Sequence, residues 1–129
     1  MKNEKFRAWH WNKKQMYEVE RIDSTRQEIT CREFQGVGKK TMVFPLDSCK
    51  LQRFTRFQDM NGNEIYEDDI VDDTCGRIGI PQSTHIVQWD EKEIEFRLRD
   101  YRGTMIPLKP HLLRVIGNRY KDKDILDRY

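Results

Sequence analysis

The chain has 129 residues and a formal net charge of +2, with 36% hydrophobic residues, 36% charged residues and a mean hydropathy of -0.92. This length is typical of one domain. The nearly balanced charge and the clustered aromatic residues (six Phe, five Tyr and three Trp) argue against a disordered chain.

No apolar run is long enough to cross a bilayer, and the amino terminus lacks the apolar core of a signal peptide. Three cysteines, Cys31, Cys49 and Cys75, are odd in number and far apart, which favours reduced structural thiols over disulfides. We therefore expect a soluble cytoplasmic protein that does not contact a membrane.

Residues 5–22 predict a first hairpin, with the two strands separated by residues 12–15. Phe6 and Ala8 alternate with Arg7 and Trp9, which is the two-residue period of a half-buried strand. If the strand continues, Trp9 and Trp11 share one of its faces. We expect that face to lie in the core or in an oligomer contact. Residues 28–34 and 41–46 predict two more strands around an exposed turn at residues 35–40. Pro45 either ends the second strand or places it at an edge.

Residues 55–71 predict a strand, a turn and a second strand. Asn61 and Gly62 tolerate positive φ at low cost, and apolar residues flank them on both sides. We expect four residues of this segment to be structural turn residues: Asn61, Gly62, Asp68 and Asp69.

The clearest hairpin lies at residues 85–99. Ile94, Phe96 and Leu98 alternate with Glu95, Arg97 and Arg99, so one face should be core and the other hydrated. A last β segment follows at residues 104–108. Residues 111–116 predict a helical turn or a strand, and residues 121–126 predict a short terminal helix.

The expected fold class is therefore mainly β, with antiparallel strands and hairpins in a small barrel-like body and short helical segments near the carboxy terminus. No internal repeat is visible in the sequence. The expected organisation is one domain over residues 1–129, with a division into lobes 1–54 and 55–129 as an alternative. By analogy alone, the second lobe would be a closed or half-closed barrel of SH3-like type.

Several separated motifs resemble the YopX family of phage and prophage proteins. They are Lys5-Phe6-Arg7-Ala8-Trp9, Met16-Tyr17, the segment Asn61-Gly62 to Val71, Val87-x-Trp89-Asp90-Glu91, and Val115-Ile116-Gly117-Asn118-x-Tyr120. Asp68 stands where the family pattern usually has glycine. The resemblance implies an intracellular phage or prophage accessory protein that is largely β and forms homo-oligomers.

Candidate chemistry is sparse. The carboxylates Glu64, Glu67, Asp68, Asp69, Asp72 and Asp73 could form a cation or nuclease site, but they lack a calcium-loop spacing and a paired histidine, which favours a solvated acidic turn. His10, His85 and His111 show no metal-binding or catalytic spacing, and no nucleophile elbow or phosphate-binding loop occurs. We expect no catalytic residue, no metal and no cofactor.

The expected interaction surface consists of Arg97, Arg99, Tyr101 and Arg102. Arginines beside an aromatic ring on a β face can hold phosphates and stack bases, so a nucleic-acid-binding module is one hypothesis. The leading hypothesis is a non-enzymatic accessory protein that self-associates and binds a host or phage macromolecule, because net charge +2 is low for a nucleic-acid-binding domain.

Overall fold

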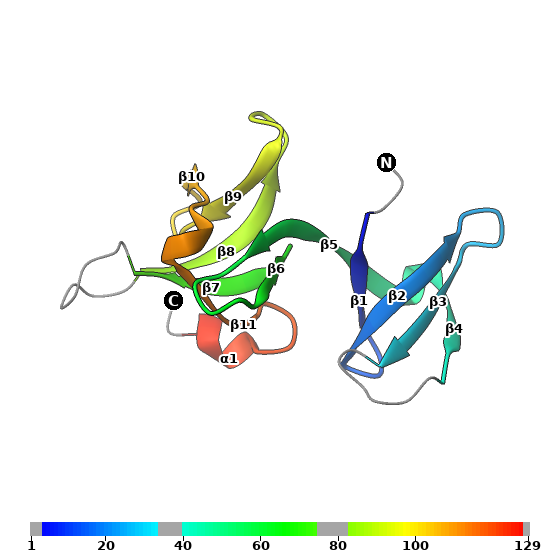
Figure 1. The fold of residues 1–129 in the computed structure, drawn as a ribbon. Coiled ribbons are helices and arrows are strands. Elements are labelled where there is room, and N and C mark those ends of the chain that lie inside the picture. The colour runs from blue at the N-terminus through cyan, green and yellow to red at the C-terminus, as the bar shows by residue number, and fades with distance from the viewer. Residues whose placement is uncertain (1–3, 34–39, 75–82, 128–129) are drawn as a thin grey trace. The chain divides into compact units, whose positions relative to one another are not determined.

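The computed structural model describes residues 4–33, 40–74 and 83–127 (Figure 1). The chain is mainly β, with antiparallel strands and one short carboxy-terminal helix, as the sequence predicts. It divides into two compact units, Met1–Arg53 and Phe54–Tyr129. Within the described residues, no helix is long and apolar enough to cross a membrane.

Unit 1 is an antiparallel sheet in the order β4-β3-β2-β1-β5. Its elements are β1 (Phe6–His10), β2 (Gln15–Asp23), β3 (Glu28–Glu33), β4 (Met42–Pro45), the 3₁₀ helix η1 (Leu46–Ser48) and β5 (Cys49–Gln58). Strand β5 continues into unit 2, because its first residues pair with β1 while Phe54 and Gln58 pair with β6.

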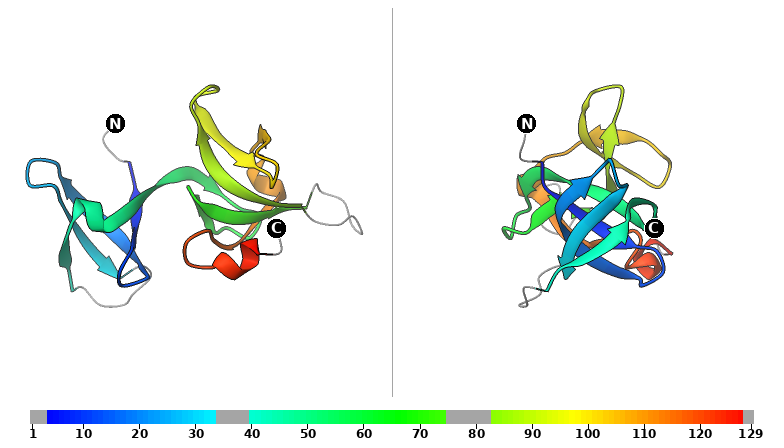
Figure 2. Two further views of the ribbon diagram at one scale, coloured as in Figure 1. Left: turned by 180° about the vertical axis from the view of Figure 1, so that it is seen from behind. Right: turned by 90° about the vertical axis from the view of Figure 1, so that its right-hand side faces the viewer.

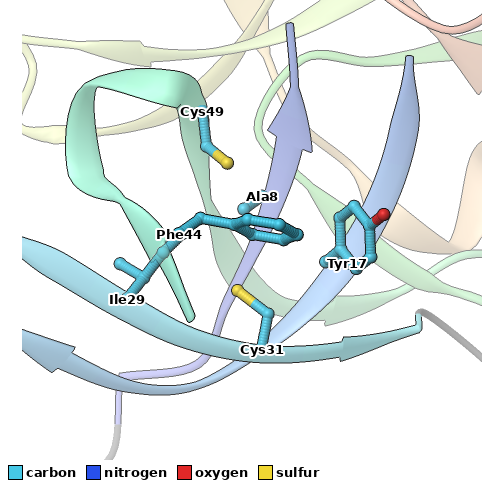
Figure 3. Packing of buried hydrophobic residues seen from close by; sticks show 6 residues of the cluster. All are labelled: Ala8, Tyr17, Ile29, Cys31, Phe44 and Cys49. Atoms are coloured by element: carbon cyan, nitrogen blue, oxygen red, sulfur yellow. The ribbon is translucent and has the colours of Figure 1, made fainter. Parts of the chain in front are cut away.

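The core of unit 1 combines aromatic and sulfur-containing side chains (Figure 3). The rings of Tyr17 and Phe44 meet edge to face with centroids 5.0 Å apart, and the fully buried Ile29 and Cys31 belong to the same cluster. Such aromatic pairs contribute stability beyond the area that they bury.

Unit 2 contains a five-stranded sheet in the order β10-β9-β8-β7-β11. Its elements are β6 (Glu64–Tyr66), β7 (Asp69–Asp73), β8 (Ser83–Asp90), β9 (Glu95–Arg99), β10 (Met105–Pro107), the 3₁₀ helix η2 (Pro110–Leu112), β11 (Leu113–Asn118) and α1 (Lys123–Leu126). Its core is aliphatic and consists of Ile65, Val71, Val87, Leu98 and Leu113. The pairing leaves β10 and β11 at opposite edges, so hydrogen bonds do not close the sheet into a barrel.

The two units have the same topology. In each, four strands form a meander, a 3₁₀ helix follows, and a fifth strand returns to pair antiparallel with the first (Figures 1 and 2). The amide of Trp11, just after β1, donates to the carbonyl of Ser48 at 3.0 Å. The amide of Thr74, just after β7, donates to the carbonyl of Leu112 at the same distance.

The equivalent turns also match. In the β2–β3 turn, Asp23 Oδ1 accepts the amides of the residues two and three positions later, and Gln27 has φ +54°. In the β8–β9 turn, Asp90 Oδ1 accepts the corresponding amides, and Ile94 has φ +56°. The expectation of no internal repeat is therefore wrong at the level of structure. The repeat is hidden because the two cores use different side chains.

Three local expectations are corrected. Ile94 lies in the turn and not on the dry strand face, and it is 74% exposed, because the residue before β9 needs positive φ to close the hairpin. Strand β1 ends at His10, so Trp11 lies in the following turn. Arg7 and Trp9 are buried like Ala8, so β1 is covered on both faces, and Arg7 Nε donates to Gln52 Oε1 at 2.7 Å.

Other boundaries agree closely with the sequence. Residues 111–116 form the end of η2 and most of β11, and the terminal helix is α1. Pro45 ends β4, which is an edge strand. Most of the expected turn at residues 35–40, and Cys75, lie outside the described residues.

Candidate functional site

The acidic segment between Glu64 and Asp73 is not the solvated turn that its composition predicts. Asp69 is 1% exposed, and Asp68 and Asp72 are also buried. Buried carboxylates require hydrogen bonds or ion pairs to offset the loss of water. The contacts of these side chains therefore decide what the segment does.

Asp68 and Asp69 shape the turn between β6 and β7. Asp69 Oδ2 accepts the amide of Tyr66 at 2.8 Å. Asp68 adopts φ +70°, in the left-handed region that favours glycine. Its carboxylate lies 3.7 Å from Arg119 Nη1, and its carbonyl accepts the Arg119 amide at 2.9 Å. Aspartate thus keeps the backbone conformation of glycine and adds an ion pair.

Asp72 connects three strands of unit 2. Its Oδ1 accepts the hydroxyl of Thr84 on β8 at 3.2 Å, and its Oδ2 accepts Arg114 Nη2 on β11 at 3.1 Å. Across residues 4–33, 40–74 and 83–127, no group of three or more His, Cys, Asp and Glu side chains is arranged to hold a metal ion. Asp69 and Asp72 thus serve as internal hydrogen-bond acceptors of unit 2.

Asn61 and Gly62 lie in the turn between β5 and β6, and Gly62 has φ +83°. Asp59 organises this turn, because its Oδ1 accepts the amides of Asn61 and Asn63, both at 2.9 Å. Burial raises the pKa of Asp59, but the hydrogen bonds from Val115, Asn63 and Asn61 outweigh it and lower the pKa below 3.8. Asp59 is not among the turn residues expected from the sequence, and its position two residues before Asn61-Gly62 was the available signal.

Arg97 and Arg99 share a face of β9, opposite the buried Leu98, as their alternation predicts. Both are half-buried. Arg97 Nη1 lies 3.1 Å from Glu95 Oε2, and Arg97 Nε lies 3.5 Å from Asp90 Oδ2. The positive charge of Arg97 is therefore balanced by two carboxylates of its own hairpin.

Tyr101 and Arg102 form an exposed pair in the β9–β10 turn. Arg102 Nε donates to Tyr101 Oη at 2.9 Å, and the guanidinium carbon lies 5.2 Å from the centre of the ring. Asp100 Oδ1 accepts the amides of Arg102 and Thr104 at 2.9 Å, and Gly103 takes φ +85°. Tyr101 is 66% exposed. The turn thus presents a preorganised aromatic and cationic pair to solvent.

The possible nucleophiles and bases of unit 1, Cys31, Cys49 and His10, are buried in it. Burial, with a contribution from Cys49, raises the pKa of Cys31 to about 12, and burial also raises the pKa of Cys49. Burial and nearby Lys13 lower the pKa of His10, whose Nδ1 accepts the Lys13 amide at 3.1 Å. These groups are poorly placed for chemistry and well placed for packing.

Comparison with known proteins gives one family and one fold. The sequence model of the YopX protein family matches residues 5–127. Among solved structures, protein EF1440 from Enterococcus faecalis is similar, with a TM-score of 0.65 and 21% identity over 96% of this chain and 98% of that chain. At this identity the similarity concerns the fold. A search of curated proteins found no match.

Proposed function

We propose, since this chain belongs to the YopX family, that it is a phage or prophage accessory protein that acts in the host cytoplasm by binding and not by catalysis. In this proposal the protein self-associates and also binds a host or phage macromolecule. Its two β units serve as scaffolds that hold exposed turns in fixed conformations.

The single observation that carries the proposal is the Tyr101–Arg102 pair. Tyrosine and arginine are the residues most often found at binding hot spots, because they combine apolar area with directed hydrogen bonds. Here the two side chains contact each other and Asp100 fixes the backbone of their turn before any partner arrives, which lowers the conformational entropy lost on binding. The carboxylates, thiols and His10 described above support the non-catalytic part, because they are already engaged in the fold.

Nucleic-acid binding is the second candidate, and the exposed Tyr101 ring beside Arg102 favours it. A base could stack on the ring while Arg102 contacts a phosphate. Arg97 would add little, because Asp90 and Glu95 already neutralise it. Binding of this kind must weaken steeply as salt rises, so electrophoretic shift across a salt series separates it from binding to a protein.

The test compares the native chain with Tyr101→Ala/Arg102→Ala. Sedimentation measures self-association, and affinity capture from cells carrying the phage or prophage identifies bound macromolecules. Capture should be lost in the variant and kept in Thr25→Ala/Arg26→Ala, which alters two exposed residues of the β2–β3 turn in unit 1. A native chain that remains monomeric and captures no macromolecule would overturn the proposal.

A further inference from the structure

The β8–β9 hairpin extends as an arm from the sheet of unit 2 (Figures 1 and 2). Strand β7 pairs with residues Ser83 to Ile86 of β8. On the other side, β10 pairs with residues Arg97 to Arg99 of β9. Beyond these points the two strands pair with each other alone, through Trp89 with Phe96 and Asp90 with Glu95. The end of the arm is therefore held by one pair of strands.

The end of the arm carries three large apolar side chains although it projects. Trp89 and Phe96 face each other across the strands, edge to face, with ring centroids 5.0 Å apart. Both are half-buried, and Ile94 in the adjoining turn is 74% exposed, the most exposed large hydrophobic residue of the described chain. Apolar side chains gathered on a projecting hairpin are typical of a surface that meets a partner.

Comparison with the equivalent turn of unit 1 indicates that Ile94 destabilises the folded chain by itself. A β-branched side chain at φ +56° is strained, whereas the equivalent position in unit 1 holds Gln27, which is unbranched at Cβ. The Gln27 carbonyl also accepts the Leu46 amide at 2.8 Å, so that turn is anchored to its own unit. Isoleucine in the exposed turn of the arm gains no comparable internal packing, which indicates a contact outside the chain.

The charges around the two exposed turns are complementary. Residues 90–95 of the arm carry four carboxylates and one lysine; Asp90 and Glu95 lie against Arg97, while Glu91 and Glu93 are exposed. The β1–β2 turn has the opposite character: Trp11 is 45% exposed, and the exposed Lys13 and Lys14 follow it with no acidic residue between residues 11 and 15. Each turn thus combines exposed apolar area with a net charge, which is negative in the arm and positive in the β1–β2 turn.

We propose that the acidic tip of the β8–β9 arm in one copy of the chain docks on the basic β1–β2 turn of a second copy. Ile94 would pack against Trp11, while Glu91 and Glu93 face Lys13 and Lys14. This inference rests on the self-association in the proposed function and assigns its surface. Because the two patches differ, the contact is head-to-tail, and it generates rings or open chains of copies.

Charge exchange tests the contact. Glu91→Lys/Glu93→Lys makes both patches basic, and Lys13→Glu/Lys14→Glu makes both acidic, so each variant alone should sediment as a monomer at low salt. A mixture of the two variants restores opposite charges and should associate again, which also shows that both variants are folded. Lys121→Glu/Lys123→Glu, with the same charge change at two exposed residues elsewhere, should associate like the native chain.

Ile94→Asn gives an independent readout. Asparagine accepts positive φ more readily, so the melting temperature should rise while self-association weakens by about tenfold, the effect of losing one modest apolar contact. A purely structural Ile94 would not move the two quantities in opposite directions.

The outcomes separate the two proposals. If the native chain associates and neither charge-exchanged variant changes the association, the arm contact is wrong and the proposed self-association stands. If the native chain is monomeric at every concentration tested, both the arm contact and the proposed self-association are wrong.

Discussion

The carboxylate of Asp59 accepts the backbone amide of Val115 at 2.9 Å, across 56 positions of sequence. Next to it, the amide of Met60 donates to the carbonyl of Leu113, also at 2.9 Å. Together these bonds satisfy polar groups of β11 on the side away from β7. The β5–β6 turn therefore covers an edge that would otherwise present free backbone groups to other chains.

Asp59→Ala should lower the free energy of unfolding by about 1–3 kcal/mol, because it removes the acceptor for three buried or half-buried amides. Urea unfolding followed by circular dichroism measures the change. Asn63→Ala, which removes only the longer side-chain bond of 3.4 Å to Asp59, serves as the comparison and should cost less. Equal losses in the two variants would mean that the backbone bonds contribute little.

The lowered pKa of Asp59 predicts that the folded chain loses stability in acid. Its pKa in the folded chain lies below 3.8, so its contribution to stability is present above that pH and is lost as pH falls through the folded pKa. The native chain should therefore lose stability more steeply than Asp59→Asn when urea midpoints are compared from pH 5 to the lowest pH at which both remain folded. Parallel curves would contradict the assigned hydrogen bonds.

The lowered pKa of His10 predicts a second, milder dependence of stability on pH. Burial and Lys13 lower its pKa below 6.5, so the unfolded chain binds a proton that the folded chain excludes. Stability should be fully present above pH 6.5 and should fall as pH decreases through the folded pKa. His10→Asn keeps an acceptor for the Lys13 amide and should flatten the dependence between pH 7 and pH 5. The exposed His111→Gln provides the control.

Gly117 permits the close approach of the segment that leads into α1. A Cβ atom at this position would lie 2.8 Å from Ile125 Cδ1 and 2.9 Å from Asp122 Oδ2. The Asp122 oxygen cannot simply rotate away, because it accepts the Asn118 amide at 3.0 Å. Gly117→Ala should therefore cost about 1–3 kcal/mol.

The double variant Gly117→Ala/Ile125→Ala separates the two contacts of Gly117. It removes the Ile125 clash but leaves the Asp122 clash, so it should remain less stable than Ile125→Ala alone in thermal unfolding. If the two variants melt together, the Asp122 contact does not constrain position 117.

The cysteines of unit 1 should resist modification. With a pKa of about 12, Cys31 has a thiolate fraction of about 10⁻⁴ at pH 8, and Cys49 is also buried with a raised pKa. In a Cys75→Ser background, a chromogenic disulfide reagent should therefore react with both thiols only after urea is added. Rapid reaction in native buffer would show that the core of unit 1 opens readily.

Side chains that look alike in the sequence have different roles in the structure. Alternation correctly places Arg97 and Arg99 on one face of β9 because strand geometry is local. The ion pairs of Arg97 depend on Asp90 and Glu95, whose positions follow from the hairpin register. Asn61-Gly62 identifies a turn in the same local way, whereas the role of Asp59 depends on Val115, which is remote in sequence.

The sequence by itself determined the β class, the hairpins and the family, because two-residue alternation, turn residues and short motifs are local properties of a chain. Only the tertiary structure revealed the repeated topology, the burial of Asp68, Asp69 and Asp72, and the exposure of Ile94. These features depend on which strands pair and at what register. Different side chains can fill equivalent cores, and a shift of one residue moves a side chain from the strand face into the turn.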